Sequence, residues 1–478
     1  MNRKAILLLS LFSLAEVAPA QDSLIDKFSS FRQSAVSEYD SFRDDATLRY
    51  AEFLRTSWVK FKSMPATGNP HDQKTPPTVY DGTDDRHFCS VKVPYTRLVG
   101  KAEQPQTASD IEGHSGCQQY FEFFSLGLAL KVRIPERNSH ILSSLETADI
   151  SEAWKILSDK KYNNLILDFL AIRRSHNLSD WAYLQVIQSF TDSFNDNKDA
   201  ATLLSAYIFA RSGYKMRLGM DEYRLFLLFG TEDLIYGRPY FKIDGYNYYP
   251  LEGEASDMFI ANFAWPDEKS LSMHIGKQLL GEAGGNMRKF TSKRYGITAE
   301  CSTGKDRIDF FSTYPASQPT EDNMTRWARY ANAPMDESTC SQLYPWLKFA
   351  ILGKSLTEAA DMLLDFVQTA FQYKKDEEVW GKDRIFFAEE TLFYPSCDCE
   401  DRAILFTRLV RDLLGLEVAL VYYPEHLAAA VRFPEGAEGD SFSTPDGEYT
   451  ICDPTYIGAP IGKTMPGMNN SQAKLLLL

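Results

Sequence analysis

The sequence predicts an α+β fold that contains two similar units and is preceded by a helical segment. Three observations predict it. A helical pattern over residues 399–414 is followed by strand, turn, strand and strand patterns, and a similar order occurs about 200 residues earlier. The chain is also 478 residues long and 44% hydrophobic, which is enough for two or three domains with cores of their own.

Residues 1–20 have the pattern of a secretory signal peptide. Two basic residues precede an apolar run over residues 5–14, and an Ala-Pro-Ala cleavage sequence ends at residue 20. No cysteine follows directly, and no other apolar run is long enough to cross a bilayer as a transmembrane segment. We therefore expect an exported, soluble protein that is periplasmic or extracellular.

Residues 21–78 form the next expected segment. Aromatic residues recur between alanines up to about residue 63 and predict one or two helices, and a Pro/Gly-rich loop follows over residues 64–78. We expect a first unit at residues 79–290 and a second at 291–478, which ends in an extended tail whose last leucines add an edge strand. Within the first unit the patterns predict strands around Cys89–Val93 and Phe121–Val132, and helices at Ile150–Leu157, Tyr162–Ile172 and Leu178–Phe194.

The second unit holds the clearest helix. Ala403, Phe406, Val410 and Leu413 recur at steps of three or four residues after Cys399, which places them on one apolar face. Gly415 follows as the expected left-handed cap. Residues 416–423 then predict a strand, Pro424-Glu425 a turn, 427–433 the returning strand, and 449–452 a third strand that ends at an aspartate.

Three residues in this frame can carry chemistry. Cys399 opens the helix, where free backbone N–H groups and the dipole are expected to lower the thiol pKa, although acidic neighbours oppose this. His426 opens a strand and can act as the base, and Asp453 can orient its imidazole. Each has a plain structural alternative: a buried cysteine, a surface histidine and a strand-ending Asp-Pro pair. Their joint order favours a catalytic site.

The run Asp398-Cys399-Glu400-Asp401-Arg402-Ala403, with His426 and Asp453-Pro454, resembles the transglutaminase-like family of the papain-like superfamily. The resemblance covers about residues 355–455. It implies a helix bearing Cys399 as nucleophile, packed on an antiparallel sheet bearing His426 as base and Asp453 as orienting residue. It also implies acyl transfer on protein or peptide amides, either by hydrolysis or by transfer to an amine. Cys397 replaces the small residue that usually precedes the Asp-Cys pair.

The first unit looks like a degenerate copy of the second. When the two units are aligned with an offset of 202 residues, Asn197 aligns with Cys399 and Arg224 with His426. An offset of 201 residues aligns Glu252 with Asp453. An asparagine cannot form a thiolate, and an arginine stays protonated and cannot act as a base. We therefore expect the first copy to keep the fold without catalysis.

The second copy has 24 additional residues before the nucleophile position. This insertion includes residues 374–395 and carries several aromatic residues, namely Trp380, Phe386, Phe387, Phe393 and Tyr394. They either form the wall of a substrate cleft or fill core. Tyr394 is also a candidate second donor of the oxyanion hole, beside the backbone N–H of Cys399.

Seven cysteines leave several pairings open. If Cys399 is free, six remain, and proximity in sequence suggests Cys89–Cys117 and Cys301–Cys340, with Cys397–Cys452 as a bridge near the site. Unpaired buried thiols are the alternative. A redox pair of Cys397 and Cys399 lacks the usual spacing of two intervening residues.

The net charge of −14 argues against nucleic-acid binding, because no basic stripe offsets it. No phosphate-binding glycine loop and no His-x-x-x-His pair occurs, so we expect no cofactor and no metal. The favoured function is thiol-dependent hydrolysis of protein or peptide amides, with amine transfer as the other outcome. The alternative is a non-catalytic exported binding or assembly protein.

Overall fold

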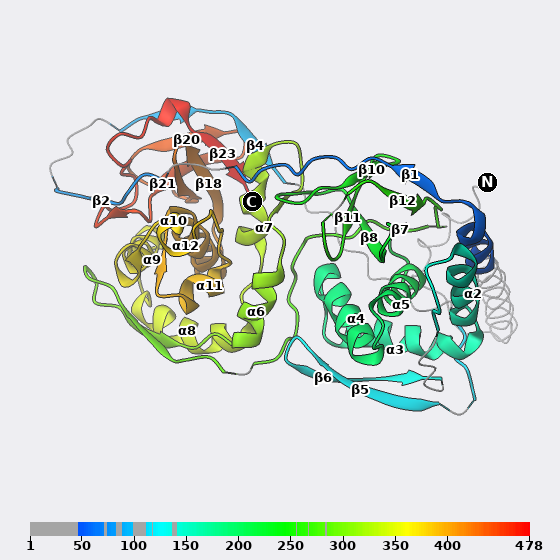
Figure 1. The fold of residues 1–478 in the computed structure, drawn as a ribbon. Helices are drawn as coiled ribbons and strands as arrows, with labels where there is room; N and C mark the ends of the chain where they lie inside the picture. The colour runs from blue at the N-terminus through cyan, green and yellow to red at the C-terminus, as the bar shows by residue number, and fades with distance from the viewer. Residues whose placement is uncertain are drawn as a thin grey trace, which may run out of the picture.

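The computed structural model describes residues 46–70, 74–82, 88–98, 111–116, 118–135, 141–254, 256–265, 267–282 and 284–478. The expected signal peptide, most of the N-terminal helical segment and Cys117 lie outside these residues. The fold is of the α+β class, as predicted, and forms two lobes side by side (Figure 1). Across the described ranges, no helix has both the length and the apolar character needed to span a membrane.

The first lobe packs helices against a six-stranded sheet (Figure 1). The strand order is β1 (Val59–Phe61), β12 (Met258–Ala261), β7 (Met216–Met220), β8 (Leu225–Thr231), β11 (Tyr246–Pro250) and β10 (Phe241–Ile243). The helices are residues 46–56, α2 (Thr147–Leu157), α3 (Asn163–Ser175), α4 (Asp180–Phe194) and α5 (Lys198–Arg211). The helix predicted to extend to about residue 63 ends at 56, because Val59–Phe61 pairs with β12 instead.

A hairpin lies against the outer side of α3 and α4 (Figure 1). It consists of β5 (Gln119–Ser125) and β6 (Leu128–Ile134), where the sequence indicated one strand-like stretch over Phe121–Val132. Leu126 and Gly127 both have positive φ values, 52° and 72°, which turn the chain back on itself. The glycine lowers the cost of this turn, and its Cα lies against that of Gly281.

The second lobe contains a seven-stranded sheet that is buried on both faces. Its order is β3 (Ser90–Lys92), β20 (Ser441–Thr444), β21 (Gly447–Cys452), β19 (His426–Arg432), β18 (Glu417–Tyr423), β23 (Lys474–Leu477) and β4 (Tyr95–Arg97). Helix α12 (Cys399–Leu414) packs on one face against Leu420 and Ala429, and α9 (Leu356–Ala370) packs beside it. Ala419 and Ala428 point to the other face, where a second apolar cluster lies.

The remaining helices and short strands connect and surround these sheets. The helices are α6 (Lys305–Thr313), α7 (Arg326–Asn332), α8 (Glu337–Ala350), α10 (Asp376–Val379) and α11 (Ala388–Phe393), with 3₁₀ turns at Lys160–Tyr162, Asn323–Thr325 and Asn470–Gln472. The paired short strands are β13 (Arg288–Thr291) with β14 (Thr298–Cys301), β9 (Leu234–Ile235) with β15 (Ser317–Gln318), β16 (Gln372–Tyr373) with β17 (Ser396–Cys397), and β2 (Thr78–Val79) with β22 (Tyr456–Ile457).

The two lobes share one order of elements. In the first, α5 leads to β7, β8 and β11, which are neighbours in the sheet; in the second, α12 leads to β18, β19 and β21 in the same arrangement. A further strand, β12 or β23, lies beside the first strand in each case. This repetition agrees with a duplicated scaffold. The unit boundaries stay a prediction, since β3 and β4 precede the first lobe in sequence yet belong to the second sheet.

The C-terminal leucines form a strand, but not at the edge of the sheet as predicted. Leu475, Leu476 and Leu477 pair antiparallel with β18 and parallel with β4 on the other side. The pairing with β4 comes from a segment almost 380 residues earlier (Leu475 with Tyr95), which no local pattern reveals. The strand is therefore interior and buried.

The six described cysteines are free thiols, so the expected bridges Cys301–Cys340 and Cys397–Cys452 are absent from this structure. Cys397 Sγ lies 3.8 Å from the carbonyl oxygen of Gln372, and Cys452 Sγ lies 3.6 Å from that of Thr450. The two sulfurs thus contact different strands. The pairing Cys89–Cys117 involves a residue outside the described ranges.

Candidate active site

The N-terminus of α12 is fixed by a reciprocal cap. Asp398 accepts the amide of Glu400 at 3.0 Å, and Asp401 Oδ2 accepts the amide of Asp398 at 3.0 Å. Cys399 is the first residue of the helix, as the sequence indicated, and is 1% exposed. Because two free amides at the helix start are satisfied by side chains, the position of Cys399 is held firmly.

His426 and Asp453 are in direct contact. His426 is the first residue of β19 and Asp453 follows β21, and the strands are adjacent in the sheet. The His426 Nε2 atom lies 2.8 Å from Asp453 Oδ2, so Nε2 donates to the carboxylate. Asp453 Oδ1 accepts the amide of Thr455 at 2.8 Å. The carboxylate is therefore held from both sides and fixes one tautomer of the imidazole, with Nδ1 unprotonated when the ring is neutral.

The Nδ1 atom of His426 is buried and has no hydrogen-bond partner among the described residues. The Cys399 sulfur interacts with the backbone N–H of Leu427, the residue after His426, and makes no hydrogen bond with His426 Nδ1 itself. The structure thus brings Cys399 to the start of β19, where His426 also lies. An unpartnered, buried nitrogen is uncommon, and this one has a lone pair available to accept a proton.

The expected lowering of the thiol pKa is not found in this structure. Burial raises the pKa of Cys399 well above its usual value, and Asp398 and Glu400 raise it further, while Lys74 and the Leu427 amide lower it. The helix N-terminus is outweighed because the sulfur has lost its water and faces carboxylates. In this arrangement Cys399 is a thiol rather than a thiolate.

Two buried side chains position the segment that follows Asp453. Gln368 of α9 donates to the carbonyls of Asp453 and Ala459, both at 3.0 Å, and accepts the amide of Gly458 at 3.0 Å. Arg402 of α12 donates to the carbonyl of Pro454 at 3.3 Å. Nothing in the local sequence marked either residue, since their partners lie 31 to 91 residues away.

Lys74 is the most unexpected neighbour of Cys399. Its Nζ atom lies 2.5 Å from Asp398 Oδ2 and 3.3 Å from Glu400 Oε2, the residues on either side of the cysteine. It also lies 3.0 Å from Asp376 and 2.8 Å from Asp383. We call these four carboxylates the acidic cluster. They keep the pKa of Lys74 above its usual value despite burial, so the ammonium is charged.

Three carboxyl groups of the acidic cluster, those of Asp376, Asp383 and Asp398, have raised pKa values. Burial raises the pKa of Asp383 to about 6 and raises that of Asp398 well above its usual value. Oxygens of Asp376, Asp398 and Asp401 lie within 4.8 Å of one another, close enough to share a metal ion. Since the Lys74 ammonium already contacts two of these three carboxylates, it supplies the cation between them.

The insertion at 374–395 fills core and also borders the N-terminus of α12. Phe386 and Phe387 are buried, and the Phe386 amide donates to Asp401 at 2.9 Å. Trp380 and Tyr394 pack edge-on with ring centroids 5.0 Å apart. The Tyr394 hydroxyl accepts from Arg384 at 3.3 Å. The core-filling alternative therefore holds for Phe386 and Phe387, and the segment also supplies Asp376 and Asp383.

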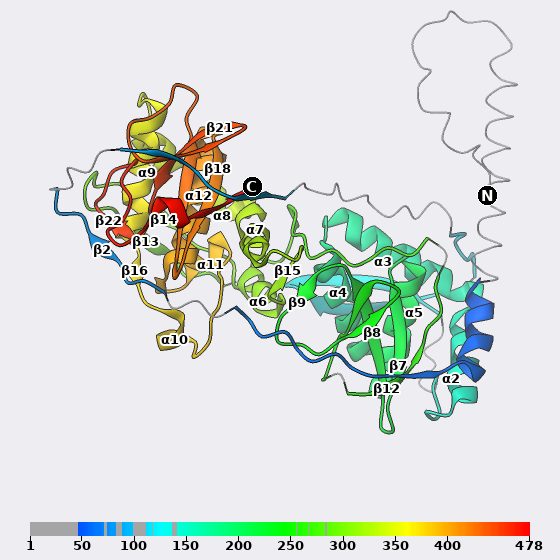
Figure 2. The ribbon, with the colours of Figure 1, turned by 90° about the horizontal axis from the view of Figure 1, so that it is seen from above.

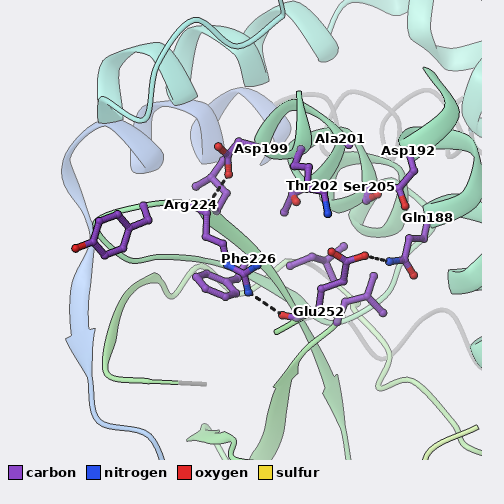
Figure 3. A pocket seen from close by; sticks show the side chains of 14 residues that line it. Gln188, Asp192, Asp199, Ala201, Thr202, Ser205, Arg224, Phe226 and Glu252 are labelled. Atoms are coloured by element: carbon purple, nitrogen blue, oxygen red, sulfur yellow. Dashed lines mark hydrogen bonds between the residues drawn. The ribbon is translucent and has the colours of Figure 1, made fainter. Parts of the chain in front are cut away.

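The first lobe has a pocket of about 250 Å³ at the corresponding place (Figure 3). Asn197 caps α5 by accepting the amides of Asp199 and Ala200, at 2.8 and 3.1 Å. Arg224 and Glu252 line the pocket, and Arg224 Nη2 lies 3.5 Å from the Glu252 carbonyl oxygen (Figure 3). This pocket is open, whereas Cys399, His426 and Asp453 are 1%, 2% and 3% exposed.

Comparison of the chain with protein-family models and with curated proteins found no match. The resemblance to the transglutaminase-like family therefore rests on the residues themselves. The geometry around Cys399, His426 and Asp453 is the basis for the functional argument below.

Proposed function

We propose that the second lobe is a thiol-dependent acyltransferase that acts on protein or peptide amides, with a papain-like core in which Cys399 is the nucleophile. The observation that carries the proposal is the orientation of His426. Its Nε2 atom is held by Asp453 at 2.8 Å, which leaves the buried Nδ1 atom free to take a proton. The thiol of Cys399 reaches the start of β19, where it interacts with the backbone N–H of Leu427 next to His426.

In this mechanism Nδ1 of His426 takes the thiol proton as Sγ of Cys399 attacks the amide carbonyl carbon. The carbonyl oxygen becomes an oxyanion, for which the backbone N–H of Cys399 is a suitable donor. The C–N bond then breaks, the imidazolium returns its proton to the leaving amine, and a thioester remains on Cys399. Water releases a carboxylic acid, or another amine forms a new amide; we favour water, which is present at high concentration.

The raised pKa of Cys399 bears on when this chemistry occurs. A buried thiol beside Asp398 and Glu400 is protonated, and no substrate reaches a residue that is 1% exposed. The described state is therefore a closed one. Separation of the covering residues from the site would readmit water and lower the thiol pKa toward the range in which His426 can deprotonate it.

The burial of the triad also favours a second candidate function, a non-catalytic binding or assembly protein. In that case the open pocket of the first lobe would provide the binding surface, with Arg224 and Glu252 at its wall. A redox function has less support, because Cys397 and Cys399 are both free thiols here. Under either main function we propose an exported protein with protein or peptide partners.

The direct test is an amide assay with matched cysteine variants. Full-length protein is incubated with a peptide mixture, and both newly formed carboxylates and incorporation of a labelled primary amine are followed by mass spectrometry. Cys399→Ala is expected to abolish both reactions. Cys397→Ala removes an equally buried thiol two residues away and is expected to leave them. If neither variant loses activity, or if both lose it to the same extent, the activity does not depend on Cys399 specifically. That result would favour the non-catalytic binding or assembly function.

A further inference from the structure

One short segment of the N-terminal region lies across the whole candidate site. We call residues 74–80 the strap. Lys74 binds Asp398 and Glu400, on either side of Cys399, and the Thr75 amide donates to the carbonyl of Glu425, which precedes His426, at 2.8 Å. Further along, β2 (Thr78–Val79) pairs in parallel with β22 (Tyr456–Ile457), just after Asp453. The strap thus contacts a neighbour of each residue of the triad.

The strap reaches the site from the other lobe. The chain leaves β1 in the first lobe and runs along the molecule to β2, which lies beside β22 (Figure 2). There it contributes little to the core, since Val79 is 72% exposed and Pro76 is also exposed. A segment with so few apolar contacts can separate from the lobe at a modest cost in free energy. Its main anchors are Lys74, the Tyr80 ring packed on Tyr456 and a few backbone hydrogen bonds.

Lys74 binds the acidic cluster in the way a ligand would. Its side chain is 1% exposed, and its ammonium contacts four carboxylates contributed by α10, α12 and the loop between α10 and α11. Burying several charges around one ammonium seldom stabilises a fold relative to apolar packing of the same volume. Four carboxyl groups that converge on one ammonium beside a nucleophile are suited to recognising a cation.

We infer that the acidic cluster is the subsite for a cationic side chain of the substrate, and that Lys74 of the strap occupies this subsite and keeps the site closed. The inference rests on the proposed function and names its substrate class: an extended peptide segment with a lysine that enters beside Cys399. The pairing of β2 with β22 shows that a strand can add there through backbone hydrogen bonds. Displacing the strap would open the site to such a segment.

The first experiment measures access to Cys399 without relying on catalysis. Full-length protein is treated with iodoacetamide, and the alkylation rate of each cysteine is followed by peptide mass spectrometry. Lys74→Gln removes the anchoring charge and is expected to raise the rate at Cys399 about tenfold through more frequent opening of the strap. Lys74→Arg keeps the charge and Val79→Ala alters only an exposed strap residue, so both should retain the slow rate.

Because Lys74→Gln leaves four carboxylates without their cation, Tyr80→Ala serves as an independent variant. The Tyr80 ring packs edge-on against Tyr456 with centroids 5.5 Å apart, and its loss loosens the strap without touching the acidic cluster. This variant is expected to raise the alkylation rate of Cys399 by the same factor as Lys74→Gln. Rates equal to those of the unaltered chain in both variants, with normal unfolding temperatures, would overturn the strap as a cover.

A peptide competition tests the cation subsite itself. The heptapeptide KTPPTVY, which has the sequence of the strap, is added to the Tyr80→Ala variant, and QTPPTVY is the control. The lysine peptide is expected to slow alkylation of Cys399 again, and the glutamine peptide is not. Equal effects of the two peptides would overturn the subsite. The strap variants could alkylate faster at Cys399, as expected, while Cys399→Ala leaves amide turnover unchanged. In that case the proposed function fails, and the strap is a cover of Cys399 without a role in catalysis.

Discussion

His426 Nε2 lies 2.8 Å from Asp453 Oδ2, although the two residues are 27 positions apart and lie on different strands. The pairing depends on the register of β19 against β21, in which Ala429 faces Cys452. This register brings the end of β21 to the beginning of β19. The contact therefore follows from the sheet, and the triad hypothesis leads to the following predictions.

Asp453→Asn is expected to slow acyl transfer by about 10²–10⁴-fold, because the amide no longer fixes the tautomer or stabilises the imidazolium. The measurement is the rate of amide turnover at saturating peptide. Asp440→Asn is the matched control, since Asp440 is also a buried carboxylate of this lobe but binds Thr464 and the Cys89 amide in place of His426. A similar loss in both variants would indicate a structural role for Asp453.

Gln368→Leu is expected to lower the free energy of unfolding by about 2–4 kcal/mol, because it leaves the carbonyls of Asp453 and Ala459 and the Gly458 amide without their partner. Urea unfolding measures the change. Gln372→Leu, at an exposed position on β16, should change it by less than about 0.5 kcal/mol. A stability loss that is equal in the two variants would contradict the positioning role of Gln368.

Asp383 is expected to make stability depend on pH. Burial and the charge of Glu400 raise its pKa to about 6, while Lys74 lowers it. A carboxyl group whose pKa is higher in the folded than in the unfolded state binds its proton more tightly in the folded state. Its contribution to the stability of the folded protein is complete at pH values below the unfolded-state pKa. The contribution is lost as the pH rises through the folded-state pKa. The free energy of unfolding of the unaltered chain should therefore increase from pH 7 to pH 5, relative to Asp383→Asn, by on the order of 1 kcal/mol.

Urea unfolding at a series of pH values measures this difference. Asp309→Asn is the control, because Asp309 is 59% exposed and pairs only with Lys305 on the same helix. Its pH profile should follow that of the unaltered chain. A profile for Asp383→Asn that runs parallel to the unaltered chain would contradict the assignment of the pH dependence to this carboxyl group.

Asn197 is expected to be a helix cap and not a catalytic residue. Its side chain accepts two amides at the start of α5, so Asn197→Ala should cost about 1 kcal/mol of unfolding free energy, while Asn197→Asp should cost little. Amide turnover should be the same in both variants as in the unaltered chain. A loss of turnover in Asn197→Asp would show that the first lobe takes part in the chemistry.

Local patterns predicted the elements that local interactions determine. The helix expected after Cys399 runs to Leu414, and Gly415 ends it with a φ of +67°, because apolar periodicity and capping residues act within a few positions. The strands around Pro424-Glu425 followed from the same reasoning, and Glu425 takes the positive φ of 68° that the turn requires.

Other features depend on contacts between distant segments. Lys74 binds Asp398 across 324 positions, and β4 pairs with β23 across the whole chain, so neither leaves a local signal. The thiol pKa was predicted in the wrong direction for the same reason. The helix N-terminus is visible in the sequence, whereas the burial of Cys399 beside Asp398 and Glu400 is visible only in three dimensions.

The central claim, that Cys399 is an acyl-accepting nucleophile activated by His426, is tested most directly by locating the acyl group. The Tyr80→Ala variant is mixed with p-nitrophenyl acetate, quenched in acid after short intervals and digested for mass spectrometry. We predict that an acetyl thioester forms on Cys399 first, and that His426→Ala in the same background slows its formation by about 10²-fold or more. Acetylation spread over several cysteines at similar rates, or a rate at Cys399 that His426→Ala leaves unchanged, would contradict the account.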